Sequence, residues 1–283
     1  MRYVFMRYPG GKPKALTFSY DDAPPQDLRL VEIFDKYGMK ATFNHNGGGE
    51  KDTNFTAEQM HEHFLSKGHE IAVHGALHIA NGAARPITGI REVLNNRLIL
   101  EEKCGMIIRG MAYPDTGIRE MSNASGYTEI KQYLTELDIA YARTLGGDND
   151  HFELPTDFHA WMPSAHHNNP NIMEYVDKFL ALDLSTKKYC AERRARLLYI
   201  WGHSFEFDGK NNWELIEKIC EKLANNPEIW YATNIEIHDY VQAYKSLRYS
   251  ADGHMVYNPT LYKIWIDVDG NLCTIESGET VRI

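Results

Sequence analysis

The sequence lacks the cysteine pattern of a cross-linked or zinc-ribbon protein. Its four cysteines, Cys104, Cys190, Cys220 and Cys273, lie far apart and form no CxxC pair. This spacing argues against a disulfide scaffold and predicts free, buried thiols of a reducing compartment. The chain also contains no internal repeat and no low-complexity segment, which excludes solenoid and disordered classes.

Long apolar runs and an excess of basic residues are missing too. No stretch of about 18 apolar residues occurs, so we expect no transmembrane helix. Residues 1–14 carry charges without an apolar segment, so we expect no secretory signal and a cytoplasmic location. The formal net charge of -9 argues against nucleic acid or an anionic membrane as partner, because both require a basic face.

What remains is the pattern of an ordinary globular α/β protein. A chain of 283 residues can form one large barrel or two smaller domains. Predicted strands and helices alternate in units of roughly 25 to 45 residues, which indicates parallel strands surrounded by helices. Beyond Asp252 short alternating strands and an Asp269-Gly270 turn are typical of a hairpin. We therefore expect a barrel over residues 1–248 and a small β appendage over 249–283.

Two adjacent carboxylates, Asp21 and Asp22, end the first clear strand. Residues 15–20 form a short apolar run, and Pro24 and Pro25 follow directly after the acidic pair. The pair therefore lies at the carboxyl end of a strand, where α/β folds assemble their active sites. The alternative is a turn with a helix N-cap, since aspartate is common in both.

Histidines follow two further predicted strands. His74 and His78 come after residues 70–73, and their spacing of four would put them on one face of a helical turn. With Asp22 they form a set of two histidines and one carboxylate that can bind a metal and leave positions open. Gly75 replaces the glutamate of a HExxH protease, so that class is excluded. His203 follows the late strand at 195–201, although a chain with 13 histidines also produces such pairs by chance.

The order of these motifs resembles the polysaccharide deacetylase family (NodB homology, carbohydrate esterase family 4) over about residues 15–240. The residues that carry the resemblance are Thr17-Phe18 before Asp21-Asp22, His74 with His78, Tyr113-Pro114, and His203 after a late strand. It implies a distorted (β/α) barrel of NodB type with about seven strands. It also implies removal of acetyl groups with a divalent metal, Zn²⁺ first, with Co²⁺, Mn²⁺ and Ni²⁺ as alternatives.

The resemblance also implies a role for each motif residue. Asp21 would be the catalytic base, and His203 the general acid that protonates the leaving group. The backbone N–H of Tyr113 would hold the oxyanion. The expected metal ligands are Asp22, His74 and His78.

Some motif positions depart from the family pattern. Ala112 stands where the family has an arginine that orients the base, and Arg109 lies three residues earlier as a replacement to be tested. The aspartate and tryptophan of the fourth motif are only loosely matched by Asp157 and Trp161. These departures put the tuning of the base in doubt and leave the metal ligands intact.

A long polar stretch, residues 145–171, separates two predicted elements. Loops of this length inside a compact domain are usually functional. His166 and His167 lie in it, and they would either line the cleft or lie on the surface.

Three functions remain open from the sequence. The leading hypothesis is a hydrolase that deacetylates an N- or O-acetylated carbohydrate, and the second is an amidohydrolase of the same fold acting on a small non-sugar amide. The third is a carbohydrate-binding protein without turnover. A glycosidase is disfavoured, because neighbouring carboxylates cannot flank a scissile bond from two sides. Aromatic side chains in the cleft would favour a sugar, and the candidates are Tyr113, Trp161, Trp201, Phe205 and Trp213.

Overall fold

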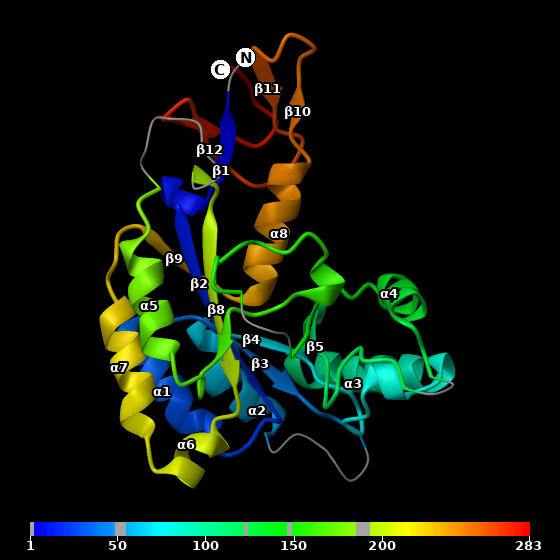
Figure 1. The fold of residues 1–283 in the computed structure, drawn as a ribbon. Helices are drawn as coiled ribbons and strands as arrows, with labels where there is room; N and C mark the ends of the chain where they lie inside the picture. Colours follow the sequence, from blue (N-terminus) through cyan, green and yellow to red (C-terminus); the bar gives the residue numbers. More distant parts are fainter. Residues whose placement is uncertain (1–2, 49–54, 122–123, 146–148, 185–192) are drawn as a thin grey trace.

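The computed structural model describes residues 3–48, 55–121, 124–145, 149–184 and 193–283 (Figure 1). Strands and helices alternate through most of this length. The strands are β1 (Val4–Arg7), β2 (Lys14–Asp21), β3 (Ala41–His45), β4 (Glu70–Val73), β5 (Gly110–Ala112), β6 (Tyr141–Arg143), β7 (Ala165–His166), β8 (Arg196–Gly202), β9 (Ile229–Tyr231), β10 (Arg248–Tyr249), β11 (Met255–Tyr257), β12 (Ile264–Val268), β13 (Asn271–Ile275) and β14 (Thr280–Arg282). The helices are α1 (Asp27–Tyr37), α2 (Ala57–Gln59), α3 (Pro86–Cys104), α4 (Tyr127–Glu136), α5 (Ile172–Ala181), α6 (Phe205–Lys210), α7 (Trp213–Leu223) and α8 (Asn234–Lys245).

The central sheet is parallel throughout and has the order β6-β5-β4-β3-β2-β8-β7. β9 adds to the first residues of β2, on the side where β3 pairs with its last residues. Seven strands in this order, with β9 beside them as the eighth and further antiparallel strands near the C-terminus, confirm the predicted distorted (β/α) barrel with a β appendage. All carboxyl ends of the parallel strands point the same way, so the residues that follow them meet at one edge.

β2 lies in the middle of the sheet and is buried along its whole length. Its alternate side chains serve two environments, because successive residues of a strand point to opposite faces. Phe18 and Tyr20 pack toward helix α1, where the Phe18 ring stacks on Phe34 at 4.7 Å between centroids. Ser19 and Asp21 point to the other face, where both face the side chain of Asn44 on β3.

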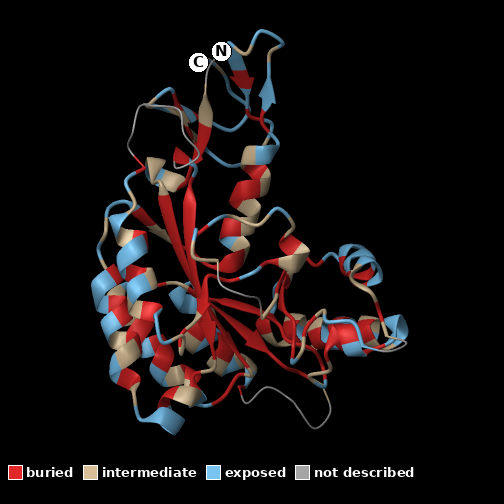
Figure 2. Cartoon of the chain, viewed as in Figure 1, coloured by how far each residue is buried: buried red, intermediate tan, exposed pale blue. Residues whose placement is uncertain are grey.

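The hydrophobic core follows from this layering. Figure 2 shows buried strands at the centre and helices whose outer faces are exposed. One core cluster fills the layer between the sheet and helices α1, α5 and α7. A second surrounds Trp161, Tyr199 and Tyr240 and joins α8 to the C-terminal strands.

The C-terminal strands form two small antiparallel sheets, ordered β1-β12-β13 and β10-β11-β14. The predicted hairpin is present: β12 and β13 are joined by Asp269 and Gly270, both with positive φ, as a tight turn requires. Figure 1 places this appendage at the amino ends of the parallel strands, beside both termini and away from α6. β1 pairs with β12, so the N-terminal strand is part of the appendage. The division at residue 248 stays a prediction.

One local prediction is corrected by the structure. The stretch at 145–171 is not all loop, because it contains the short strand β7, which pairs with β8. At the start of α2, Thr56 and Gln59 form a capping box with both reciprocal hydrogen bonds.

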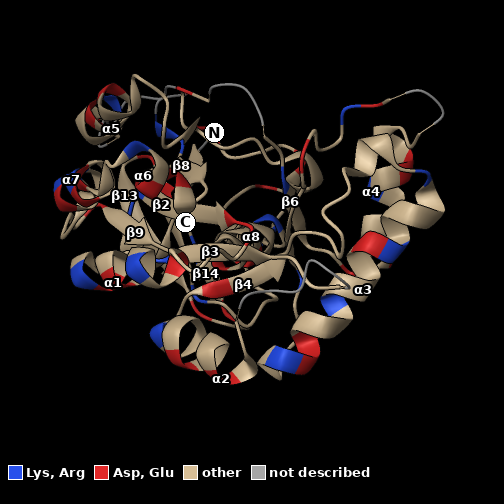
Figure 3. Cartoon of the chain, turned by 90° about the horizontal axis from the view of Figure 1, so that it is seen from below, with Lys and Arg blue, Asp and Glu red and all other residues tan. Residues whose placement is uncertain are grey.

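The described residues contain no helix that is both long and apolar enough to cross a membrane. Cys104 and Cys220 are buried free thiols, whereas Cys273 is half-buried, and Cys190 lies outside the described residues. On the outer helices, positive and negative side chains are interspersed, as Figure 3 shows along α3.

Candidate active site

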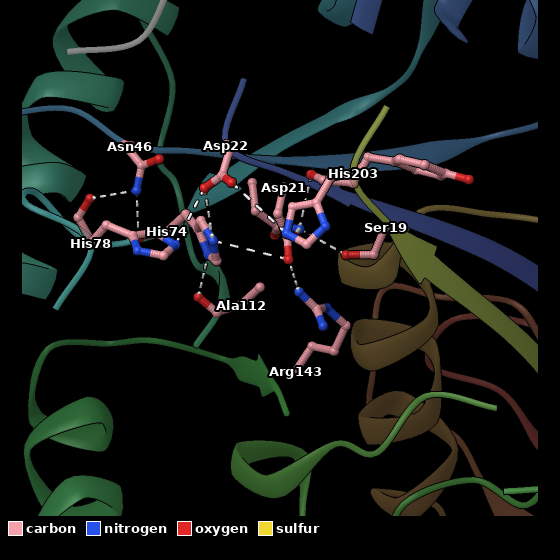
Figure 4. A network of polar contacts seen from close by, with 12 residues as sticks. Ser19, Asp21, Asp22, Asn46, His74, His78, Ala112, Arg143 and His203 are labelled. Carbon is pink, nitrogen blue, oxygen red and sulfur yellow. Dashed lines mark hydrogen bonds and ion pairs between the residues drawn. The ribbon is translucent and has the colours of Figure 1, made fainter. Parts of the chain in front are cut away.

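Asp21 and Asp22 lie side by side at the carboxyl end of β2 (Figure 4). Neighbouring residues of a straight strand would point apart. Here the chain turns immediately after Asp21, since Asp22 has φ 74° and Ala23 has φ 47°. This left-handed turn brings both carboxylates to one site. Asp21 is fully buried, whereas the side chain of Asp22 is 31% exposed and can reach a bound ion.

His74 and His78 meet Asp22 from the loop after β4. The Nε2 atoms of His74 and His78 lie 3.5 and 3.3 Å from Asp22 Oδ1. The segment is a bent loop with positive φ at Gly75 and His78, so the predicted helical turn is wrong. The convergence holds nevertheless: one donor atom from each of these three residues lies within 4.8 Å of the others.

Side chains from neighbouring elements form hydrogen bonds with the backbone of this loop. Asn46 donates to the carbonyl of His74 at 2.8 Å, and Asn96 on α3 accepts from its N–H at 2.9 Å. Glu92, also on α3, accepts from the N–H groups of Leu77 and Ile79. Helix α3 therefore fixes the position of both histidines.

The second ring nitrogen of His74 decides which form of the imidazole faces Asp22. His74 Nδ1 lies 3.0 Å from the carbonyl oxygen of Ala112. A carbonyl oxygen only accepts, so Nδ1 carries the hydrogen and Nε2 presents its lone pair to Asp22. This is the arrangement that a histidine ligand of a metal ion adopts. The site therefore fits a divalent cation.

Arg143 at the end of β6 forms a buried ion pair with Asp21. Burial alone would raise the pKa of the Asp21 carboxyl, but the Arg143 guanidinium, aided by His203, outweighs it and lowers that pKa. Asn44 donates to the other oxygen, Oδ1, at 2.8 Å. Asp21 is thus held as a carboxylate with a fixed orientation.

Arg143 is the residue that the sequence analysis missed. It supplies the guanidinium expected before the Tyr113-Pro114 motif, from the neighbouring strand instead. Arg109, the replacement considered from sequence, pairs with Asp239 and does not contact Asp21. The only sequence signal for Arg143 is its place at the carboxyl end of a predicted strand.

His203 follows β8 and faces Asp22 from the side opposite the other histidines (Figure 4). Its Nε2 lies 3.8 Å from Asp22 Oδ2, and its Nδ1 lies 3.6 Å from Glu206 Oε2. Burial alone would lower the pKa of His203, but Glu206, Asp21 and Asp22 outweigh it and raise that pKa. A histidine that keeps its proton beside a base suits a general acid.

The loose match to the fourth motif does not hold in space. Asp157 hydrogen-bonds Tyr127 and Lys131, and Trp161 is fully buried against Tyr141 and Phe158. Neither residue contacts His203 in the described structure. Glu206, three residues after His203, is the carboxylate that lies beside its ring.

The backbone N–H of Tyr113, expected to hold an oxyanion, is engaged in this structure. It donates to the carbonyl of Arg143 at 2.9 Å, as part of the pairing of β5 with β6. Its role toward an oxyanion stays a prediction. The Tyr113 hydroxyl is also engaged, since it donates to the His159 carbonyl at 2.7 Å.

Of the five aromatic candidates, one is exposed beside the site. The Phe205 ring is 42% exposed and lies 5.2 Å from the His203 ring, centroid to centroid. Trp201 is 9% exposed and lies under the Arg143 guanidinium. Tyr113 and Trp161 are fully buried, and Trp213 packs against Arg29 away from the site.

His166 and His167 neither point to solvent nor reach Asp22. Both lie beside Glu206, with His166 Nε2 at 3.3 Å and His167 Nε2 at 3.1 Å from its Oε2. The three residues form a second set of two histidines and one carboxylate.

Comparison with known proteins gives a family match over part of the chain. Residues 7–132 match the family model described as polysaccharide deacetylase, a range that contains Asp21, Asp22, His74 and His78. No curated protein sequence matches the chain.

Solved structures are similar in fold at low sequence identity. A Mycobacterium smegmatis protein assigned to the polysaccharide deacetylases is 15% identical, with 87% of this chain and 96% of that chain covered at a TM-score of 0.55. The Xyl-CE4 domain of a xylanase from a Trinervitermes trinervoides hindgut metagenome is 18% identical, with coverage of 82% and 92% at 0.52. Puue allantoinase is 13% identical, with coverage of 82% and 91% at 0.55. At these identities the likeness concerns the fold alone.

Proposed function

Because residues 7–132 match the polysaccharide deacetylase family model, we propose that the chain is a metal-dependent hydrolase that removes acetyl groups from an N- or O-acetylated carbohydrate. One observation carries this proposal. The donor atoms of Asp22, His74 and His78 converge, and the Ala112 carbonyl holds His74 in its metal-binding form. Asp21 and His203 lie close to the same carboxylate, from two other strands.

Asp22, His74 and His78 would hold the ion, with Zn²⁺ as the first choice and Co²⁺, Mn²⁺ or Ni²⁺ as alternatives. A divalent ion at such a site acidifies water and polarises an acyl carbonyl. The remaining work falls to side chains of this chain.

Asp21 accepts the proton of the attacking water. Its carboxylate is ionised because Arg143 lowers its pKa, and it lies 3.9 Å from His74 Nε2, beside the ligand set. His203 carries a proton and donates it to the departing amine or alcohol. The two roles need groups whose pKa values are displaced in opposite directions, as they are here.

A small non-sugar amide is the second candidate substrate. The observation that favours it is the scarcity of exposed aromatic surface, since Phe205 alone among the five aromatic candidates is exposed beside His203. A sugar polymer would be expected to use several such platforms.

Acetate release is the test. Wild type would be assayed on N- and O-acetylated sugars and on small amides, with chelator and with added Zn²⁺ or Co²⁺. We expect release that stops with chelator and falls about 10²–10⁴-fold in Asp21→Asn. Asp157→Asn, a carboxylate paired with Lys131 outside the site, is the matched control and should keep full activity.

The alternatives predict other outcomes. Turnover of the amides alone would select the second candidate. Zn²⁺ binding without turnover of any substrate in the panel would leave a carbohydrate-binding protein and overturn the hydrolase.

A further inference from the structure

A second set of two histidines and one carboxylate lies beside the site, and its composition equals that of the proposed metal set. It consists of His166 at the end of β7, His167, and Glu206 on α6. Both Nε2 atoms face the same carboxylate oxygen, Glu206 Oε2. Composition alone would suggest a second metal ion.

The outer nitrogen of His166 argues against a metal. The backbone N–H of Asn168 donates to His166 Nδ1 at 3.0 Å. Nδ1 must therefore present a lone pair, and a neutral imidazole then carries its hydrogen on Nε2. An Nε2–H group cannot coordinate a cation, but it can donate to the Glu206 carboxylate that it faces.

His167 is fixed against Glu206 by packing. Its ring is fully buried and stacks between Tyr20 and Phe207, at 5.6 and 4.3 Å between centroids. A Cβ atom at Gly202 would overlap His167 Nδ1, so the absence of a side chain at 202 makes room for the ring. Among the described residues, the carboxylate near the His167 ring is that of Glu206, 3.1 Å from Nε2, and neither ring nitrogen forms a hydrogen bond there.

Glu206 in turn faces His203 in two ways. Glu206 Oε2 accepts from the backbone N–H of His203 at 3.4 Å and lies 3.6 Å from its Nδ1. Burial would raise the pKa of Glu206, but His167 and His203 outweigh it and lower that pKa. Burial lowers the pKa of His166 to about 4, so this imidazole is neutral beside the ionised carboxylate.

We infer that His166 and His167 are positioning residues: His166 presents its Nε2–H to Glu206, and His167 packs its ring against the same carboxylate. Glu206 in turn holds His203 through the backbone N–H of that residue, with the ring nitrogen Nδ1 toward Glu206 and Nε2 toward Asp22. The inference rests on the proposed function, because it assigns His203 a proton to deliver. It also assigns the second set no metal ion.

A pair of variants at His166 tests this. His166→Gln keeps an N–H near the position of Nε2, whereas His166→Leu removes it. The substrates are ethyl acetate, whose leaving group needs a proton, and 4-nitrophenyl acetate, whose leaving group departs as a stable anion. We expect His166→Leu to lose about 10- to 100-fold in kcat on ethyl acetate and less than about twofold on 4-nitrophenyl acetate. His166→Gln should stay near wild type on both esters.

Equal losses on both esters would mean that His166 serves the fold alone, and would overturn the inference. A loss in His166→Gln as large as in His166→Leu would do the same, because the N–H that His166→Gln keeps would then not be the group that matters. If wild type with Zn²⁺ releases no acetate from either ester, from the acetylated sugars or from the small amides, the proposed function fails instead.

The number of metal ions bound per chain tests the inference without an activity assay. Titration of the full chain with Co²⁺, followed by absorption and calorimetry, should give one ion per chain in wild type and in His166→Leu. Asp22→Asn should bind none at that affinity. Two ions in wild type, one of them lost in both His166 variants, would replace the donor role with a second metal site.

Discussion

Two sets of the same composition, Asp22 with His74 and His78 and Glu206 with His166 and His167, lie on either side of His203. The two sets differ in the backbone group that contacts Nδ1 of one histidine. The Ala112 carbonyl accepts from His74 Nδ1, so the lone pair on Nε2 is left for a cation. The Asn168 N–H donates to His166 Nδ1, so the hydrogen on Nε2 is left for an anion. The comparison teaches that residue type and spacing indicate a candidate metal site, whereas the backbone groups around the histidines determine whether their nitrogens can bind a cation.

The largest expected difference between the two sets is in metal binding. His74→Leu should lose Zn²⁺ and, with it, about 10³-fold of activity, because Lewis-acid stabilisation supplies several kcal/mol. His166→Leu should keep the ion. Zn²⁺ content after gel filtration, measured with acetate release, checks both; loss of Zn²⁺ from both variants would erase the distinction.

The second expected effect concerns the buried ion pair between Arg143 and Asp21, which lies beside the first set. Arg143→Met leaves the buried Asp21 carboxylate without its partner, and we expect a loss of about 3–5 kcal/mol in the free energy of unfolding. Urea denaturation measures this. Arg109→Met, which breaks the more exposed pair with Asp239, should cost about 0–1 kcal/mol.

A double variant separates the buried charge from simple packing. Adding Asp21→Asn to Arg143→Met removes the uncompensated carboxylate and should restore part of the stability. If the double variant is no more stable than Arg143→Met, lost packing explains the effect.

Glu70 extends the comparison to a buried carboxylate without a cationic partner. Thr42, Tyr141 and the N–H of Ile235 donate to it. Burial dominates and raises its pKa from 4.5 to about 7. Below pH 4.5 the proton is bound in both states; above it the unfolded chain releases the proton first. The free energy of unfolding should therefore fall by about 3 kcal/mol between pH 4.5 and 7.

Urea midpoints across this pH range, in wild type and Glu70→Gln, test the effect. The difference between the two profiles should develop between pH 4.5 and 7 and then stay constant. Glu62→Gln, at an exposed position, is the control and should follow wild type. Parallel profiles for Glu70→Gln and wild type would contradict the assignment.

The smallest expected effect tests the second set through its packing. Gly202→Ala places a methyl group against His167, and we expect a loss of about 1–3 kcal/mol in stability together with the ester-selective loss described for His166→Leu. Gly209→Ala on α6, where a Cβ meets nothing within 4 Å, is the matched control. Thermal unfolding and the two-ester assay check both; an unchanged Gly202→Ala would mean that His167 does not need its present position.

Much of the site was readable from the sequence because its residues follow strands. Asp21, Asp22 and His203 each end or follow an apolar run, and parallel strands bring such positions to one edge. Glu206 had a weak signal, three residues after His203, and was missed because a short helix, α6, was not predicted there. The hydrogen bond of the Tyr113 N–H to β6 was not predicted, because it depends on how the strands pair.

The sequence by itself determined the alternation of strands and helices, the hairpin at Asp269-Gly270 and the identity of the residues at the carboxyl edge. Local periodicity and turn chemistry suffice for these. Only the tertiary structure decided that Arg143 serves Asp21, that Glu206 serves His203, and which nitrogen of His74 and His166 carries hydrogen. The groups involved lie between 2 and 122 residues away in the chain, and their mutual positions depend on how the strands and loops pack together.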